Sequence, residues 1–348
     1  MYFASDNAGP AHPKVLEALV AANTGYAMGY GADPIMEEVR QMVRDMFEAP
    51  DAAVYLTATG TAANAILLAT LANPWDTIFC APMAHIQEDE CNAPEFYSNA
   101  KLTLVPAVDA KMTPDALRAA MLAEQTRGVH GPQRGPVSIT QVTEKGTIHT
   151  VDEIRALSDV AREFGSKVHL DGARFCNALV ALGCTAAEMT WKAGVDMVSF
   201  GGTKNGLMGV EACVIFDPKL AWEFELRRKR GGHLFSKHRF LSAQMKAYLT
   251  GDLWREMAIS ANASCTRLAE GLRGHNTAEL LYEPQANMIF VNLPRRDHQR
   301  LMAAGAVYYT MGGDPATGDP DEMIPARLVT DWSMTNEGVD QFLQILRA

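Results

Sequence analysis

Apolar and polar positions alternate along the first two thirds of the chain between the period of a strand and that of a helix. Short apolar runs with the length and composition of buried strands lie at 54–56, 77–80, 101–105, 136–141, 167–171 and 196–200. Helix-period or continuously apolar stretches between them lie at 35–47, 62–71, 113–124 and 151–164. This alternation predicts an α/β fold, with a mostly parallel sheet covered by helices on both faces.

Capping signals support the predicted helices. Thr150 and Glu153 have the spacing of a capping box, in which each side chain accepts the backbone N–H of the other residue. Thr185 and Glu188 repeat this spacing and predict a further short helix before the last of these strands.

The pattern changes after residue 216. Longer helical stretches are followed by strands that alternate with helices, at 218–230, 238–272, 288–293, 296–304, 327–330 and 335–346. A chain of 348 residues is long for one hydrophobic core. We therefore expect a second, smaller α+β domain at the C-terminal end.

Composition narrows the class of protein. Hydrophobic residues make up 48% and charged residues 21%, which is ordinary for a soluble globular protein. The formal net charge of -10 argues against a nucleic-acid partner, which requires a basic surface. No apolar stretch approaches the roughly 18 residues of a membrane helix, and the N-terminus lacks a basic region followed by an apolar one. We expect a cytoplasmic protein with no membrane partner.

Neither the cysteines nor the histidines are spaced as metal ligands. The six cysteines are dispersed, and the nine histidines show no metalloprotease spacing. His169 and Asp171 lie two apart on one predicted strand and so share a face, but no third ligand accompanies them. We therefore expect no metal site.

Two charged side chains fall where predicted strands end. Lys204 follows a strand across the turn at Gly201 and Gly202, and Asp171 ends the preceding strand. The carboxyl ends of parallel strands meet at one edge of the sheet, where α/β proteins bind ligands. A pyridoxal-phosphate enzyme needs a lysine to bond the cofactor and a carboxylate to keep the pyridine nitrogen protonated. A solvated surface lysine and a helix N-cap at Asp171 are the alternatives.

Further polar residues follow the same pattern. Gly60 and Thr61 stand between a strand and a helix, where free backbone N–H groups and a hydroxyl can bind a phosphate; a merely capped helix is the alternative. The segment lacks the lysine of a nucleotide loop and the triple glycine of a dinucleotide motif, so a phosphate monoester fits better. His85 follows another strand, where it can stack on a flat ring or transfer protons, unless it is simply solvated.

Arginines and one serine complete the set. Arg327 lies in a predicted strand and needs an anion if it faces inward, such as a substrate carboxylate; an exposed strand position is the alternative. Ser5 begins a short polar stretch near the N-terminus. The basic run at 227–230 is typical of a solvated helix end, or it contacts a phosphate in a neighbouring subunit.

Together these motifs resemble the low-specificity L-threonine aldolases, pyridoxal-phosphate enzymes of the aspartate-aminotransferase-like fold (fold type I). The resemblance runs over almost the whole chain, and the order and spacing of its motifs are specific: 30–34, 59–64, 84–85, 171–174, Lys204 and 326–330. With this resemblance we predict an N-terminal segment over 1–14 that reaches the active site, a large cofactor-binding domain over 15–250 and a small domain over 251–348.

The resemblance also implies residue roles. The residues expected to be catalytic are Lys204, which bonds the cofactor, His85, which stacks on its ring, and Asp171, which pairs with its pyridine nitrogen. Those expected to hold pyridoxal 5'-phosphate are Gly60, Thr61, His85, Asp171, Arg174 and Lys204. Those expected to hold the substrate carboxylate are Ser5, Arg174 and Arg327. The family is oligomeric, so a homodimer or homotetramer is implied, with active sites at the interface and with Tyr30 and the Arg228 region across it.

The chain departs from the family at one informative place. Family members carry Glu-Asn-Thr-His after the strand equivalent to 137–140, whereas this chain has Gln141, Val142, Thr143 and Glu144. The second active-site histidine, which lies near the substrate's β-hydroxyl in the family, is therefore missing. Glu144 is expected in its place, which leaves the preference between threo and erythro substrates open.

The reaction that the resemblance implies is retro-aldol cleavage of β-hydroxy-α-amino acids such as L-threonine, L-allo-threonine or phenylserine to glycine and an aldehyde. The proton acceptor for the β-hydroxyl stays open between His85, a water and Glu144. An aminotransferase or β-eliminating lyase on the same fold is the alternative activity, because a fold does not determine chemistry. A non-catalytic, regulatory cofactor-binding module is a further alternative.

Overall fold

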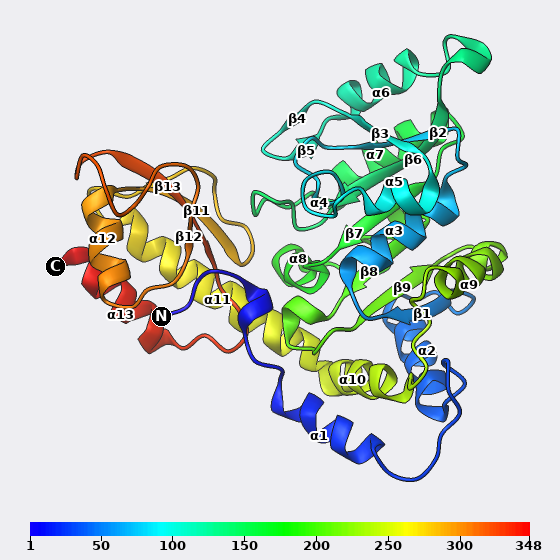
Figure 1. Ribbon diagram of the computed structural model, residues 1–348, viewed down its shortest axis with the longest axis horizontal. Helices are drawn as coiled ribbons and strands as arrows, with labels where there is room; N and C mark the ends of the chain where they lie inside the picture. Colours follow the sequence, from blue (N-terminus) through cyan, green and yellow to red (C-terminus); the bar gives the residue numbers. More distant parts are fainter.

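The computed structural model describes all 348 residues and contains a large unit and a small unit, each built on its own sheet (Figure 1). The large sheet has seven strands in the order β1-β9-β8-β7-β6-β2-β3. Their bounds are β1 Ala53–Thr57, β2 Asp76–Cys80, β3 Lys101–Leu104, β6 Gln133–Thr140, β7 Val168–Gly172, β8 Met197–Gly201 and β9 Glu211–Ile215. Only β9 runs antiparallel to its neighbours. The predicted, mostly parallel α/β sheet is confirmed.

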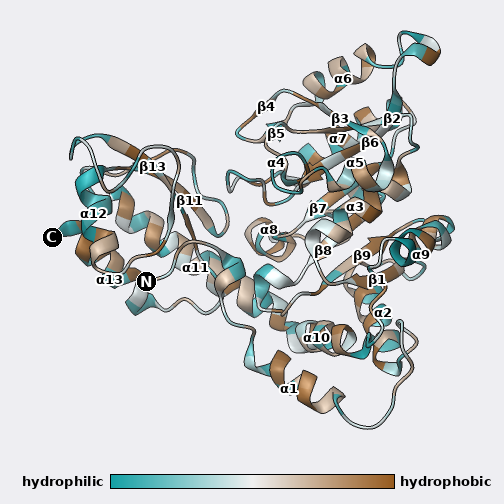
Figure 2. Ribbon diagram, in the orientation of Figure 1, coloured by the Kyte–Doolittle hydropathy of each residue, from teal (hydrophilic) through white to brown (hydrophobic).

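Helices cover both faces of this sheet. Successive strand residues alternate between two cores: Leu56 belongs to one hydrophobic cluster and Tyr55 to the other. The first cluster is completed by α2 Pro34–Met46, α7 Val151–Glu163, α8 Phe175–Leu182 and α10 Arg239–Leu249. The second is completed by α3 Gly60–Leu71 and α9 Ala221–Arg230. The apolar colour along β1 and β9 in Figure 2 marks strands that are buried on both sides.

Shorter elements surround this core. They are α1 Pro13–Ala22, α4 His85–Glu88, α5 Ala93–Ser98, α6 Pro114–Ala123 and the hairpin of β4 Ala107–Val108 with β5 Lys111–Met112. α1 packs on α10, α5 on α3 and α6 on α7. None of the helices is both long and apolar enough to span a membrane.

The small unit is an antiparallel sheet in the order β10-β11-β13-β12, with helices packed on it. Its elements are α11 Leu253–Arg273, β10 Glu279–Leu280, β11 Met288–Pro294, α12 Arg295–Ala303, β12 Tyr309–Thr310, β13 Met323–Val329 and α13 Asn336–Arg347. α11 runs from the large unit into the small one (Figure 1). The N-terminus joins this unit, because Phe3 is buried in its core and accepts the Val329 N–H at 2.8 Å. The boundaries at 14/15 and 250/251 stay predictions.

Two helix predictions are wrong in detail. The helix predicted over 238–272 is two helices, because Gly251 and Asp252 adopt left-handed φ values of 62° and 56° between α10 and α11. The capping box of Thr185 and Glu188 forms, with N–H to side-chain distances of 2.8 and 3.1 Å, but turns follow it, and the only helix between it and β8 is a single 3-10 turn at Trp191–Ala193.

The turn that carries Lys204 is tied to the start of the small unit's long helix and to α10. Tyr248 of α10 is fully buried, and its hydroxyl accepts Asn205 Nδ2 at 2.7 Å and lies 3.3 Å from the Gly201 carbonyl. Asn205 Nδ2 also donates to the Trp254 carbonyl at 2.9 Å. Both ends of the turn are therefore held by one buried hydroxyl.

We predict that Tyr248→Phe lowers the free energy of unfolding by about 1–3 kcal/mol, because the Asn205 amide loses a buried acceptor. Urea unfolding of the apoprotein measures this. Tyr26→Phe is the matched control, since Tyr26 is fully exposed and the same hydroxyl deletion should change nothing there. Equal stability of the two variants would contradict the role of Tyr248.

Candidate active site

A cavity of about 230 Å³ lies at the carboxyl-terminal edge of β7 and β8. Five of the predicted residues line it, namely Gly60, Thr61, His85, Asp171 and Lys204. Side chains that the sequence did not single out also line it, among them Asn64, Ser199, Glu90 and Glu211. Five of the six residues predicted to bind the cofactor therefore meet in one place, with polar partners around them; Arg174 does not line the cavity.

The glycine turn brings Lys204 into this cavity. A Cβ on Gly201 would lie 2.6 Å from the Ala173 carbonyl oxygen and 2.7 Å from that of Gly172, so only glycine lets β8 end this close to β7. Lys204 is partly buried, lines the cavity and forms no salt bridge or hydrogen bond. Burial first, and then the Arg174 charge, lower the pKa of the Lys204 amine. A lowered pKa favours the neutral, nucleophilic form that bonds a carbonyl.

Asp171 is a buried carboxylate in a fixed orientation. Its Oδ2 accepts Asn64 Nδ2 at 2.9 Å, and its Oδ1 accepts the Ala173 N–H at 3.1 Å. Asn64 Oδ1 in turn accepts the Ser199 hydroxyl at 2.9 Å. The N-cap position of α8 is Arg174, so Asp171 does not cap that helix. Its arrangement suits a group that faces a protonated ring nitrogen.

His85 is held by two carboxylates. Its Nδ1 lies 2.8 Å from Glu90 Oε1, and its backbone N–H donates to Glu144 Oε1 at 2.7 Å. The hydrogen bond to Glu90, against the effect of burial and with help from the Asp171 charge, raises the pKa of His85. The side chain lines the cavity and is only partly exposed, so His85 is not a solvated loop residue.

Glu144 lies behind His85. It does not line the cavity, and its second oxygen, Oε2, is buried without a partner. Burial raises the pKa of the Glu144 carboxyl to about 7. Direct contact between Glu144 and a substrate hydroxyl stays a prediction.

The start of α3 fits a phosphate. Thr59 accepts the N–H groups of Ala62, through Oγ1, and Ala63, through its carbonyl, each at 3.1 Å. The N–H groups of Gly60 and Thr61 have no protein acceptor, and a Cβ built on Gly60 would meet no heavy atom within 4 Å. Unpaired donors at a helix N-terminus with open space before them suit an anion. With Lys204 and Asp171 on the same cavity, the residues present fit pyridoxal phosphate.

The residues predicted to bind the substrate carboxylate lie beside this cavity and already have protein partners. Arg174 forms a bidentate ion pair with the buried Asp6, at 2.7 and 2.9 Å. Arg327 donates to the Ala4 carbonyl at 3.3 Å, while its Nε is buried without an acceptor. The Ser5 hydroxyl accepts the Asn7 N–H at 3.1 Å. Arg327 is therefore not an exposed strand residue, and it keeps an unused donor.

Asp6 and Glu211 are acids that the sequence interpretation did not assign to the site. Burial opposes ionisation of Asp6, but the Arg174 and Lys204 charges hold the pKa of this carboxyl below its usual value. Glu211 accepts the Gly202 N–H at 2.8 Å, and burial raises its pKa to about 7. Glu211 could have been found from the sequence, because it is the one charged residue in the otherwise apolar strand β9.

The prediction of a solvated basic helix end is wrong for Arg228. This residue of α9 is 4% exposed, donates to the Leu56 carbonyl at 3.2 Å and lies 4.8 Å from the centre of the Tyr55 ring. The aromatic face and the carbonyl compensate for its burial. Its neighbours Lys229 and Arg230 are exposed.

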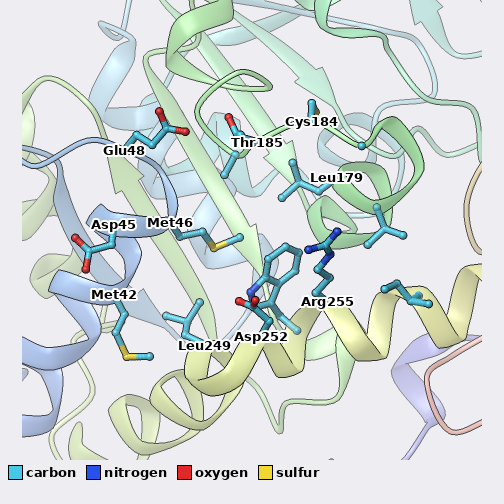
Figure 3. Close-up of a pocket in the computed structure, with 15 residues that line it drawn as sticks. Met42, Asp45, Met46, Glu48, Leu179, Cys184, Thr185, Leu249, Asp252 and Arg255 are labelled. Atoms are coloured by element: carbon cyan, nitrogen blue, oxygen red, sulfur yellow. The ribbon is translucent and has the colours of Figure 1, made fainter.

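A larger hollow, of about 820 Å³, lies elsewhere, between α2, α8 and the start of α11 (Figure 3). Its walls are mostly apolar, with charged residues such as Asp45, Glu48 and Arg255 among them. None of the predicted site residues lines it. No group of three or more histidine, cysteine or acidic side chains is arranged to hold a metal ion.

The fold and this site define a fold-type I pyridoxal-phosphate enzyme. The model of the β-eliminating lyase family matches residues 2–300. The chain is 38% identical to the low-specificity L-threonine aldolase of Pseudomonas aeruginosa, over 99% of this chain and 96% of that protein. It is 37% identical to the enzyme of the same name from Pseudomonas sp. strain NCIMB 10558, over 99% and 97%. The chain belongs to the low-specificity L-threonine aldolase family.

A solved structure agrees with this assignment. The threonine aldolase of Leishmania major superimposes on the chain with a TM-score of 0.92 and 26% sequence identity, over 99% of this chain and 98% of that one. The chain is accordingly a carbon–carbon lyase, and its cofactor is pyridoxal 5'-phosphate.

We predict that Gly60→Ala weakens cofactor binding without destabilising the apoprotein. The new methyl group meets no protein atom, and alanine is the better helix former, but it enters the space left for the phosphate. Absorbance titration of the apoprotein with pyridoxal phosphate, beside urea unfolding, measures both effects. Gly338→Ala, in the first turn of α13, is the control. Unchanged cofactor affinity in Gly60→Ala would place the phosphate elsewhere.

We also predict a pH-dependent effect of Glu144→Gln. In the folded state the pKa of Glu144 is about 7, above the usual value of 4.5. Between pH 4.5 and pH 7, Glu144 is therefore protonated in the folded state and ionised in the unfolded state. The stability that the protonated Glu144 contributes is therefore fully present below pH 4.5 and is lost as the pH rises through 7. Relative to wild type, the variant should gain about 2–3 kcal/mol between pH 5 and pH 8, at about 1.36 kcal/mol per pKa unit.

Urea unfolding of the apoproteins at both pH values measures the difference. Glu88→Gln is the control, because Glu88 is exposed. Glu211 titrates in the same range in all three proteins and cancels in the comparison. A constant difference between Glu144→Gln and wild type from pH 5 to pH 8 would contradict the raised pKa.

Proposed function

We propose that this chain cleaves L-threonine and related β-hydroxy-α-amino acids to glycine and an aldehyde by a retro-aldol reaction. One observation carries the proposal: the unpaired amine of Lys204 and the buried carboxylate of Asp171 line the same cavity as an open helix N-terminus. The relatives at 37–38% identity, both low-specificity L-threonine aldolases, support it.

Pyridoxal phosphate, when bound, supplies an electron-accepting ring that stabilises the carbanion left by bond cleavage. The Gly60 and Thr61 N–H groups would hold its phosphate, and Asp171 would hold the proton on the ring nitrogen. Lys204 would anchor the cofactor covalently. His85 accepts the proton of the β-hydroxyl, because His85 lines the cavity whereas Glu144 does not.

The substrate carboxylate belongs beside Arg327 in this proposal. Arg327 Nε is a buried donor without an acceptor, and a carboxylate would satisfy it. Arg174 uses its Nε hydrogen and one Nη2 hydrogen for Asp6, so the two Nη1 hydrogens and the second Nη2 hydrogen remain for other acceptors. The Ser5 hydroxyl, which already accepts a backbone N–H, can still donate its own hydrogen.

β-Elimination is the second candidate, because the family model that matches residues 2–300 is that of the β-eliminating lyases. The two reactions break different bonds and so give different products. Retro-aldol cleavage of threonine or phenylserine releases glycine and an aldehyde, whereas β-elimination releases ammonia and a keto acid. A panel of L-threonine, L-allo-threonine and both phenylserine diastereomers, assayed for both product pairs, separates them.

We further propose a cytoplasmic homo-oligomer, dimeric or tetrameric, with active sites at the interface. Tyr26, Met28 and Tyr30 support it, because these large apolar side chains are exposed close together in sequence. The exposed end of α9 lies beside them, with Lys229 Nζ 4.8 Å from the centre of the Tyr30 ring. A second copy would cover this segment.

We predict that Lys204→Ala abolishes the visible absorbance of the bound cofactor and reduces aldehyde release from L-threonine to background. The variant lacks the only lysine that lines the cavity. Absorbance spectroscopy and an aldehyde-release assay measure the two effects. Lys219→Ala, at an exposed lysine outside the cavity, is the matched control and should behave as wild type. Retained turnover in Lys204→Ala would overturn the proposed function.

A further inference from the structure

Glu90 is a buried acid whose position calls for an explanation. Its side chain is 0% exposed, although a buried carboxyl is unfavourable unless it is hydrogen-bonded. Glu90 lines the active-site cavity but forms no hydrogen bond or salt bridge with Lys204. Its side chain caps no helix: α5 begins at Ala93 with Asn92 as its N-cap residue, and it is the Glu90 backbone carbonyl that accepts the Ala93 N–H.

Both hydrogen bonds of this carboxyl go to site residues. Glu90 Oε1 lies 2.8 Å from His85 Nδ1 and accepts Asn64 Nδ2 at 2.9 Å. The second hydrogen of the same Asn64 nitrogen goes to Asp171 Oδ2 at 2.9 Å. An unbroken chain of hydrogen bonds therefore joins His85, through Glu90 and Asn64, to Asp171.

With Glu90 ionised, this geometry determines which ring nitrogen of His85 carries the hydrogen. Burial raises the pKa of the Glu90 carboxyl, but the His85 and Asn64 hydrogen bonds favour its ionised form, and an ionised carboxylate can only accept a hydrogen bond, so the imidazole donates from Nδ1. In the neutral ring the remaining nitrogen, Nε2, then has a free lone pair. No protein group takes a hydrogen bond from or gives one to Nε2, and His85 lines the cavity.

We propose that Glu90 is a positioning residue: its carboxylate keeps the hydrogen of His85 on Nδ1 and so presents Nε2 as the proton acceptor for the substrate's β-hydroxyl. This inference rests on the proposed function for the identity of the substrate, but not for the state of the ring. Through Asn64, the same carboxylate fixes the orientation of His85 relative to Asp171.

The charges around His85 oppose one another. Glu90 and Asp171 favour its protonated form, Lys204 disfavours it, and Glu144 contacts its backbone N–H. Glu90 forms the only side-chain hydrogen bond to the ring. Removing the Glu90 charge should therefore change the titration of His85 more than any exposed substitution does.

The test uses full-length protein, as apoprotein for NMR and with pyridoxal phosphate for kinetics. In ¹⁵N-histidine spectra, with His85 assigned by its loss in His85→Asn, we expect neutral wild-type His85 to carry its hydrogen on Nδ1. In Glu90→Gln the pKa of His85 should fall by about one unit or more, because an adjacent opposite charge is lost. The acid limb of kcat/KM for L-threonine should move to lower pH by a similar amount.

Two further variants sharpen the result. Glu88→Gln removes the same charge from the same segment at an exposed site, and the pKa of His85 should stay at its wild-type value. Glu90→Asp keeps the charge and should restore much of the His85 pKa even if Glu90→Gln folds poorly. A wild-type ring with its hydrogen on Nε2, or equal His85 pKa values in Glu90→Gln and Glu88→Gln, would overturn the proposal. These ring measurements need no substrate, so absence of aldolase activity would overturn only the proposed function.

Discussion

The site depends on one neutral amide that lies between two buried acids. Asn64 donates both hydrogens of Nδ2, one to Glu90 and one to Asp171, and it accepts the Ser199 hydroxyl through Oδ1. An apolar residue there would leave two buried carboxylates short of donors, at roughly 1–3 kcal/mol or more each. An aspartate would add a third negative charge. The apolar helix α3 therefore carries one amide on the face that meets the sheet.

The other charged groups of the site are likewise placed near groups of opposite charge. Asp6 neutralises Arg174, and Lys204 lies between acids on three different elements: Asp6, Asp171 and Glu211. None of these acids pairs directly with the Lys204 amine, which leaves it free to react. The two unpaired N–H groups of α3 face the cavity on another side, where a phosphate brings its own negative charge. Protein and cofactor together thus complete a site that the protein alone leaves with unpaired donors.

The sequence predicted the sheet and the positions of Asp171 and Lys204 at the ends of strands, because both follow from local patterns. Apolar runs and turn glycines mark where β7 and β8 end, and Asp171 and Lys204 stand at those ends. It could not predict that Glu90 meets Asn64, because this contact joins residues 26 apart on elements whose packing is tertiary. The burial of Arg228 could not be predicted either, because it depends on the packing of α9 against Tyr55 of β1, which the sequence of the basic helix end does not show. The break at Gly251 was missed because an isolated glycine does not by itself end a helix.

The N-terminal segment has a consequence for how the enzyme is made. Phe3 pairs with Val329 in the small unit's sheet, and three residues later Asp6 enters the ion pair with Arg174. Asp6 therefore has no ion-pair partner until Arg174 has been synthesised, and Phe3 has no backbone partner until Val307 and Val329 have been synthesised. The large sheet can form earlier, from contacts that are closer in sequence. Closure of the active site is thus a late, long-range event in folding, and an incomplete chain that lacks β13 would carry the cofactor residues without a finished site.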